Sequence, residues 1–358
     1  MTILFIVLLA AIAAPWLFAR LFLAGPDLAR YDKPAGQRFA PERPEHPAVP
    51  TAMARLTDPD APGKGASRRQ QIASTRRHFN RMFDDHVLDG RFTPLHRDGV
   101  IGEWVLAPGA DPRRRMLYLH GGGFMLGSPR SHRTITARMS ALCGGAVLAL
   151  DYRLMPEHKR IDGIEDARRA YRWMLEHGPD GVSSAQAVFV AGDSAGANLT
   201  LALLAWARDH KLRAADAAVA IAPPTDGTFA SPSLRANLAS DYMLGPAYGW
   251  VLRLPRTLIL WLGWLRAGIR PNDPQVSPAF GDLSKLPPTL VHVSETEMLL
   301  DDARRYVNRA REAGSPATLQ TWNRTLHVWH IFHPELPEAE EAYAEIGKFI
   351  AAAAPPGP

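Results

Sequence analysis

The sequence predicts an α/β fold in which a mostly parallel central sheet is covered by helices on both faces. Three observations point to this fold class. From about residue 101 onward, short apolar segments alternate with helical segments; a glycine triplet directly follows one apolar segment; and a glycine-flanked serine stands between another apolar segment and a helix. Apolar strands bracketed by helices are typical of parallel sheets that are buried on both faces.

The expected strands are short and the expected helices longer. We expect strands at residues 103–106, 116–119, 146–150, 187–190, 217–221, 289–293 and 317–322. We expect helices at residues 67–83, 164–176, 195–209, 299–313 and 337–352. With 358 residues, of which 46% are hydrophobic, the chain is long enough to bury a large core in one main domain with an accessory part.

Composition excludes several classes of protein and site. The single cysteine, Cys143, rules out an intrachain disulfide and argues against a cysteine-built metal site. The net charge of +5 lies partly in short arginine runs such as residues 113–115, which are typical of a solvated surface. Because no nucleic-acid recognition motif accompanies these runs, we expect no nucleic-acid partner.

The N-terminal segment does not look globular. Residues 3–19 carry no charge, and residues 1–24 together approach the roughly 20 residues that span a bilayer. We therefore expect a membrane anchor, and the basic residues that follow it place the main domain in the cytoplasm. The alternatives are a cleaved signal, with a secreted or periplasmic protein, and a buried or interfacial helix.

We expect three regions along the chain. Residues 1–24 form the hydrophobic segment, residues 25–95 a proline-rich linker with an N-terminal cap region, and residues 96–358 the main domain with a cap insertion at about 225–275. Within that insertion, residues 257–265 are strongly apolar but too short to span a membrane. This run is interpreted as a packed helix, an acyl-binding wall or a surface that leans on a membrane.

The segment GDSAG at residues 192–196 indicates a nucleophile. It follows an apolar strand and opens a helix, which is the context that the G-x-S-x-G turn requires. Such a turn holds its serine, here Ser194, in a strained backbone conformation with the hydroxyl projecting. The flanking glycines are needed because neighbouring elements pass too close for a Cβ atom.

A serine nucleophile needs a base and an acid, and both are expected farther along the chain. Glu297 lies nearest the loop after one strand, whereas Asp301 and Asp302 fall at the start of a helix, where acidic residues are often only dipole partners. Three histidines follow the last strand, and position favours His327 over the later ones, His330 and His333.

The glycine triplet at residues 121–123 indicates an oxyanion hole. Backbone N–H groups stabilise the oxyanion formed when an ester carbonyl is attacked, and they must approach the substrate without a Cβ in the way. We expect these donors from Gly122, Gly123 and Ala195, with Gly121 as the alternative within the triplet.

Six segments, in order and over about two thirds of the chain, are similar to the hormone-sensitive lipase family of α/β-hydrolases. They are HGGGF at 120–124, DYRLMPEH at 151–158, GDSAGAN at 192–198, SPAFGDLSKLPPTL at 277–290, the acidic segment at 297–301 and HVW at 327–329. The resemblance implies an α/β-hydrolase fold with a helical cap, no cofactor, and ester hydrolysis through an acyl-enzyme. It assigns Ser194 as nucleophile, His327 as base and Glu297 as acid, at a position where family members more often carry aspartate.

One segment departs from that family's pattern. After DYRLMPEH the family usually continues with an aromatic residue, proline and alanine, whereas this chain has KRIDG at residues 159–163. The expected function is that of a carboxylesterase-type serine hydrolase acting on small to medium apolar acyl esters. Lactone, amide or acetyl-group hydrolysis by the same residues, and a non-catalytic receptor for a small ligand, are the alternatives. The oligomeric state is left open.

Overall fold

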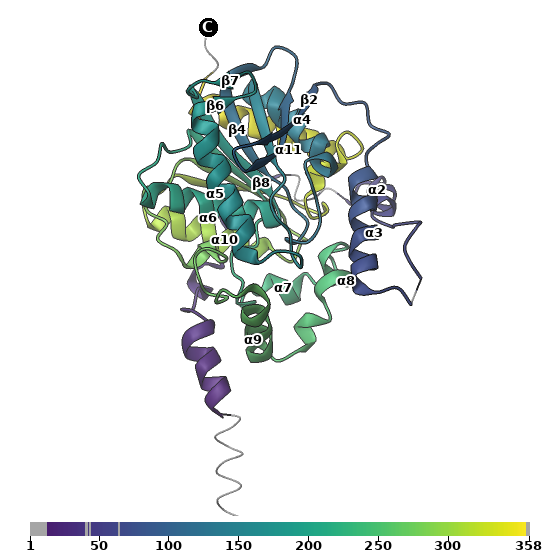
Figure 1. Cartoon of the computed structure of the whole chain (residues 1–358). Coiled ribbons are helices and arrows are strands. Elements are labelled where there is room, and N and C mark those ends of the chain that lie inside the picture. The colour runs from purple at the N-terminus through teal and green to yellow at the C-terminus, as the bar shows by residue number, and fades with distance from the viewer. Residues whose placement is uncertain (1–12, 40–41, 43, 64, 356–358) are drawn as a thin grey trace, which may run out of the picture.

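One large sheet organises the molecule in the computed structural model, which describes residues 13–39, 42, 44–63 and 65–355 (Figure 1). In the described residues its nine strands pair in the order β1-β11-β10-β9-β8-β4-β5-β3-β2. Their bounds are β1 Gln37–Phe39, β2 Arg91–Arg97, β3 Val100–Leu106, β4 Asp111–Leu119, β5 Gly145–Leu150, β8 Ala187–Asp193, β9 Ala217–Ile221, β10 Thr289–Ser294 and β11 Ala317–Trp322. Only β3 runs against its two neighbours, and all other pairings in the sheet are parallel. The predicted fold class is confirmed.

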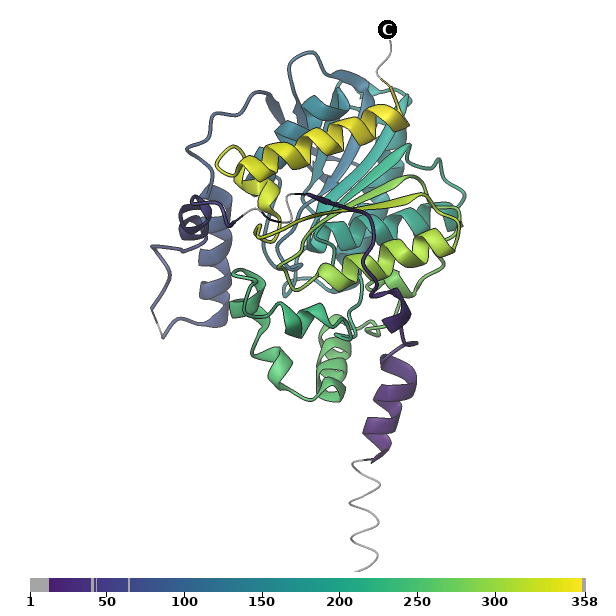
Figure 2. The same cartoon turned by 180° about the vertical axis from the view of Figure 1, so that it is seen from behind.

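Helices cover both faces of this sheet (Figures 1 and 2). The longer helices outside residues 225–275 are α3 Arg68–Arg81, which lies to one side of the sheet, and α4 Arg133–Cys143, α5 Arg160–Glu176, α6 Ala195–Asp209, α10 Leu300–Glu312 and α11 Pro337–Ala353. Buried side chains of α4 and α11 share one apolar core with one face of the sheet, and those of α5, α6 and α10 share a second core with the other face. A short ribbon of β6 (His177–Gly178) and β7 (Gly181–Val182) lies apart from the large sheet.

Three helices within residues 225–275 stand together outside the sheet. They are α7 Ser233–Ala236, α8 Leu244–Tyr248 and α9 Arg256–Ala267, and α9 lies beside the N-terminal helix in both views (Figures 1 and 2). Upstream of the main domain, α2 (Val49–Arg55) and α3 lie together at one side of the molecule (Figure 1). The division into linker, cap and catalytic domain stays a prediction.

The expectation of a membrane-anchored protein is wrong. Within the part of the chain that the structure describes, no helix combines the length and apolar character needed to cross a bilayer. Residues 13–18 are helical and continue into η1 (Ala19–Leu23), where Ala19 and Leu23 are fully buried against Leu260 of α9. The aromatic ring of Phe18 stacks on Trp261, also in α9. Apolar residues of the segment therefore pack against α9 of the same chain, while residues 1–12 of the expected anchor lie outside the described residues.

Candidate active site

Ser194 lies in a sharp turn between β8 and α6. Its φ of 48° and ψ of −117° are rare for a residue with a side chain, so the turn is strained. A Cβ atom on Gly196 would lie 1.8 Å from the carbonyl oxygen of Leu119, and one on Gly192 would lie 2.6 Å from the carbonyl of Gly196. Both flanking positions must therefore be glycine, because β4 and α6 approach the turn too closely for any side chain.

His327 lies between the serine and a buried carboxylate. Its Nε2 atom is 2.9 Å from the Ser194 hydroxyl, and its Nδ1 atom is 3.3 Å from the nearer carboxylate oxygen of Glu297. His327 comes from the loop after β11 and Glu297 from the loop after β10, so adjacent parallel strands deliver both. The second carboxylate oxygen accepts the backbone N–H of Ser294 at 3.2 Å. The structure thus brings together the three residues expected from the sequence.

Burial and charge both shift the pKa values of His327 and Glu297. Burial lowers the pKa of His327, but the neighbouring Glu297 carboxylate acts the other way and holds the pKa above the ordinary value of a histidine. Burial also raises the pKa of Glu297, against the opposing effect of the His327 ring. A carboxylate beside the imidazole favours its protonated form, as a general base requires when it takes a proton.

The competing histidines have other partners. The Nε2 atom of His330 lies 3.1 Å from the Nδ1 atom of His292 in the core behind the loop. His333 lies near the surface, where its ring is 2.8 Å from the carboxylate of Glu340. Neither ring is brought to Ser194.

The competing carboxylates also have other partners. Asp301 accepts the backbone N–H of Ser233 at 2.8 Å, and Asp302 accepts those of Thr225 and Asp226 at 2.7 and 3.0 Å. Burial and the nearby Asp226 raise the pKa of Asp302 to about 7. Asp301 therefore ties the start of α7 to α10, and Asp302 ties the loop after β9 to α10.

The glycine triplet follows β4 and curls beneath the serine turn. The N–H of Gly121 donates to the Asp193 carboxylate at 3.0 Å. Among the hydrogen bonds found within the described residues, none is donated by the N–H of Gly122, Gly123 or Ala195. Gly122 and Gly123 adopt φ values of 110° and 61°, which favour glycine. Three backbone donors are therefore left for a ligand.

Comparisons with known proteins agree with this geometry. A family model described as the alpha/beta hydrolase fold matches residues 116–331. An acetyl-hydrolase of Streptomyces hygroscopicus is 42% identical over 249 residues, which cover 69% of this chain and 78% of that protein. The solved structure of an esterase from the bacterial hormone-sensitive lipase family is 33% identical, has a TM-score of 0.73, and covers 87% of this chain and 99% of its own.

The chain belongs to the hormone-sensitive lipase family of α/β-hydrolases. An esterase of Acinetobacter venetianus, 32% identical over 72% of this chain and 80% of that protein, is a further relative. The protein is a carboxylesterase-type serine hydrolase, and the predicted family and activity are confirmed.

A buried network around Asp193 adjoins the serine turn of this lipase-family member, and sequence reasoning did not identify its members. The Tyr118 hydroxyl donates to the Asp193 carboxylate at 2.6 Å, and the Nε2 atom of His132 lies 3.4 Å away. Burial alone would raise the pKa of Asp193, but the His132 ring and the Tyr118 hydrogen bond bring it below its usual value. An ionised carboxylate thus lies directly behind the nucleophile.

His120, the residue before the glycine triplet, also has a partner that sequence reasoning did not identify, Tyr152. The His120 ring stacks on that of Tyr152 with centroids 4.2 Å apart, and the Tyr152 hydroxyl donates to the His120 carbonyl at 2.7 Å. Tyr152 stands in the DYRLMPEH segment, so the family pattern was the signal that could have found this contact.

Proposed function

We propose that Ser194, His327 and Glu297 hydrolyse small to medium apolar acyl esters through an acyl-enzyme. The observation that carries this proposal is the continuous line of contacts from the Ser194 hydroxyl to the His327 ring and on to the Glu297 carboxylate. A hydroxyl becomes a useful nucleophile when a neighbouring base takes its proton and a third group orients that base.

The reaction then has two halves. Ser194 attacks the acyl carbon while Nε2 of His327 takes the hydroxyl proton, and the protonated ring gives that proton to the departing alcohol. Water then attacks the acyl-enzyme with the same ring as base, which releases the acid and restores the serine. Glu297 keeps the proton of the neutral ring on Nδ1 and stabilises the imidazolium.

The oxyanion of each tetrahedral intermediate is assigned to the N–H groups of Gly122, Gly123 and Ala195. Support comes from the absence of other acceptors for these donors among the described residues. Gly121 is left out of the assignment because its N–H is already bonded to Asp193. Donors that are fixed before the reaction stabilise developing charge without reorganisation.

An apolar acyl group is supported by the surroundings of Glu297. Met298 and Leu299 follow it directly and pack with Leu234 and Leu252 of the predicted cap insertion, about 225–275, in one buried apolar cluster. Burial of apolar surface contributes about 25 cal/mol per Å². Acyl chains that reach this cluster are therefore expected to bind more tightly than acetyl.

The test uses p-nitrophenyl acetate, butyrate and octanoate. Ser194→Ala and His327→Ala should each lower kcat by about a thousand-fold or more, because serine and base act as a unit. The matched controls are Ser184→Ala and His333→Ala, which alter exposed or surface-paired side chains and should keep kcat within about two-fold of the unmodified protein. Retention of more than about a tenth of kcat in Ser194→Ala would refute the assignment of the nucleophile.

A further inference from the structure

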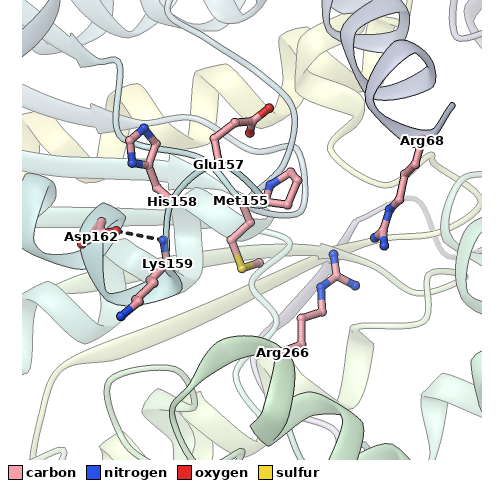
Figure 3. A pocket seen from close by; sticks show the side chains of 8 residues that line it. Arg68, Met155, Glu157, His158, Lys159, Asp162 and Arg266 are labelled. Carbon is pink, nitrogen blue, oxygen red and sulfur yellow. Dashed lines mark hydrogen bonds between the residues drawn. The ribbon is translucent and has the colours of Figure 1, made fainter.

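A cavity of about 540 Å³ lies between α3, α9 and the start of α5. It is lined by Arg68, Met155, Pro156, Glu157, His158, Lys159, Asp162 and Arg266. The guanidinium groups of Arg68 and Arg266 point toward each other across this cavity (Figure 3). Two like charges that face each other across open space favour an anion between them.

The positive charges of the cavity lack counter-ions within the described protein. No carboxylate there lies within ion-pair distance of Arg68, Lys159 or Arg266. The two carboxylates of the lining are used elsewhere. Glu157 pairs with Arg76 at 2.9 Å, and Asp162 accepts the backbone N–H of Lys159 at 2.8 Å. The cavity therefore presents net positive charge.

Two helices begin at the rim of this cavity with basic residues. Arg68 is the first residue of α3, which has no acidic residue in its first turn, and Lys159 immediately precedes α5. A helix N-terminus carries partial positive charge and usually attracts acidic side chains. At the start of α3 the basic side chain of Arg68 adds to this positive potential, whereas in the first turn of α5 the acidic Asp162 accompanies Lys159.

Residues 159–163, KRIDG, are also where the sequence departs from its family's usual pattern. Arg160 is buried, lies 3.7 Å over the ring of Phe124, and donates to the side-chain oxygen of Asn198 at 2.8 Å. Burial lowers its pKa to about 10, so the side chain is still charged at neutral pH. This segment thus places one cation, Lys159, in the lining of the cavity and another, Arg160, on Phe124 in the loop that carries the glycine triplet.

The cavity shares a wall with that loop. The N–H of Met155, a lining residue, donates to the carbonyl of Phe124 at 2.9 Å, and the side chain of Arg266 contacts the sulfur of Met125. Because Met125 is two residues beyond Gly123, their Cα atoms are at most about 7 Å apart. The cavity therefore borders the segment that continues directly from the glycine triplet.

We infer that this cavity binds a carboxylate or phosphate carried by the alcohol part of the ester substrate. The alcohol part fits this cavity because it leaves after the first half-reaction, and most residues that line the cavity are exposed to solvent. The apolar cluster near Glu297 suits the acyl part. This inference rests on the proposed function and adds an anionic leaving group to it.

The test compares three acetyl esters: neutral 4-acetoxybenzamide, 4-acetoxybenzoate and 4-acetoxyphenyl phosphate. The ratio of kcat/KM for each anionic ester to that for the neutral ester is measured in unmodified protein, Arg68→Gln, Arg266→Gln and the double variant. Each single change should lower the ratio about two- to five-fold, through KM, and the double change about ten-fold, since exposed ion pairs are modest. Whichever anionic ester shows the larger loss identifies the preferred group.

Arg270→Gln is the matched control, because this exposed arginine is in the same cap segment but outside the cavity lining. It should leave the ratio unchanged. Raising NaCl from about 50 to 500 mM should lower the ratio in the unmodified protein but not in the double variant. If the folded double variant hydrolyses the neutral ester and shows an unchanged ratio, the inference about the cavity is wrong. Failure of the proposed function would instead appear as no hydrolysis of the neutral ester by the unmodified protein.

Discussion

Glu297→Gln should nearly abolish turnover, although the glutamine side chain has nearly the same size and shape as that of glutamate. The backbone N–H of Ser294 donates to one carboxylate oxygen, and Nδ1 of His327 faces the other. In glutamine the single oxygen satisfies the Ser294 N–H, which turns the amide NH₂ toward His327. The ring then accepts at Nδ1 and carries its proton on Nε2, where it cannot take the proton of Ser194.

The size of the loss follows from two contributions. If the amide instead turned its oxygen toward His327, its NH₂ group would face the buried N–H of Ser294. Two donors facing each other cost about 1–3 kcal/mol, so only a small fraction of the protein would hold the ring with its proton on Nδ1. Glutamine also replaces the charged acceptor of the imidazolium by a neutral one, which costs roughly a further 1.5–3 kcal/mol. Since about 1.4 kcal/mol is a factor of ten, kcat should fall about 100- to 10,000-fold.

The assay is hydrolysis of p-nitrophenyl butyrate between pH 5 and 9. Activity requires neutral His327, and Glu297 holds the pKa of this ring above its ordinary value, so kcat/KM should rise with pH through that raised pKa. Without the carboxylate, burial dominates and lowers the pKa, so the acid limb of the residual activity should move to lower pH.

Two variants serve as controls. Glu297→Asp keeps the charge and should retain at least about a tenth of kcat, while Glu295→Gln alters a carboxylate that pairs with Arg38 and should change kcat less than about two-fold. If Glu297→Gln keeps kcat within about three-fold of the unmodified protein, the tautomer argument is wrong.

Two further predictions concern the supports of the site. Gly121→Ala would place a Cβ atom 2.1 Å from the Asp193 carboxylate, so we expect a lower melting temperature and a strong loss of kcat; unchanged values of both would contradict the packing. The pKa of Asp302 is raised to about 7 in the folded protein, so its contribution to stability is present below about pH 4 and is lost as pH rises through 7. Asp302→Asn should therefore flatten the fall in melting temperature between pH 5 and 8, and an unaltered pH dependence would count against that raised pKa.

The central strands were predictable because they are buried on both faces. Residues 217–221 were predicted with the bounds of β9, a continuous apolar run that marks such a strand. Residues 317–322 were predicted with the bounds of β11, in which apolar and polar residues are mixed. The edge strands β1 and β2 were not predicted. They contain exposed polar residues, and β2 also contains Pro94, so no apolar run signals them and only pairing with a neighbour makes them strands.

The candidate site was predictable where chemistry demands particular residue types at loops after strands. Ser194, Glu297 and His327 each follow a strand, and the structure brings them together. The partners of Asp193 could not be found in this way. Tyr118 belongs to a strand interior and His132 to a short helix, so both look like ordinary core residues until the fold places them beside a carboxylate.

The contacts of Asp193 couple substitutions in the serine turn to substitutions in the glycine triplet. One carboxylate stands next to the nucleophile in the chain and also holds the N–H of Gly121, at the start of the glycine triplet. Changes in the serine turn and in the glycine triplet therefore share a partner, and their effects on activity should not add. Libraries that randomise the two motifs separately would miss the combinations in which a new turn is matched by a new loop.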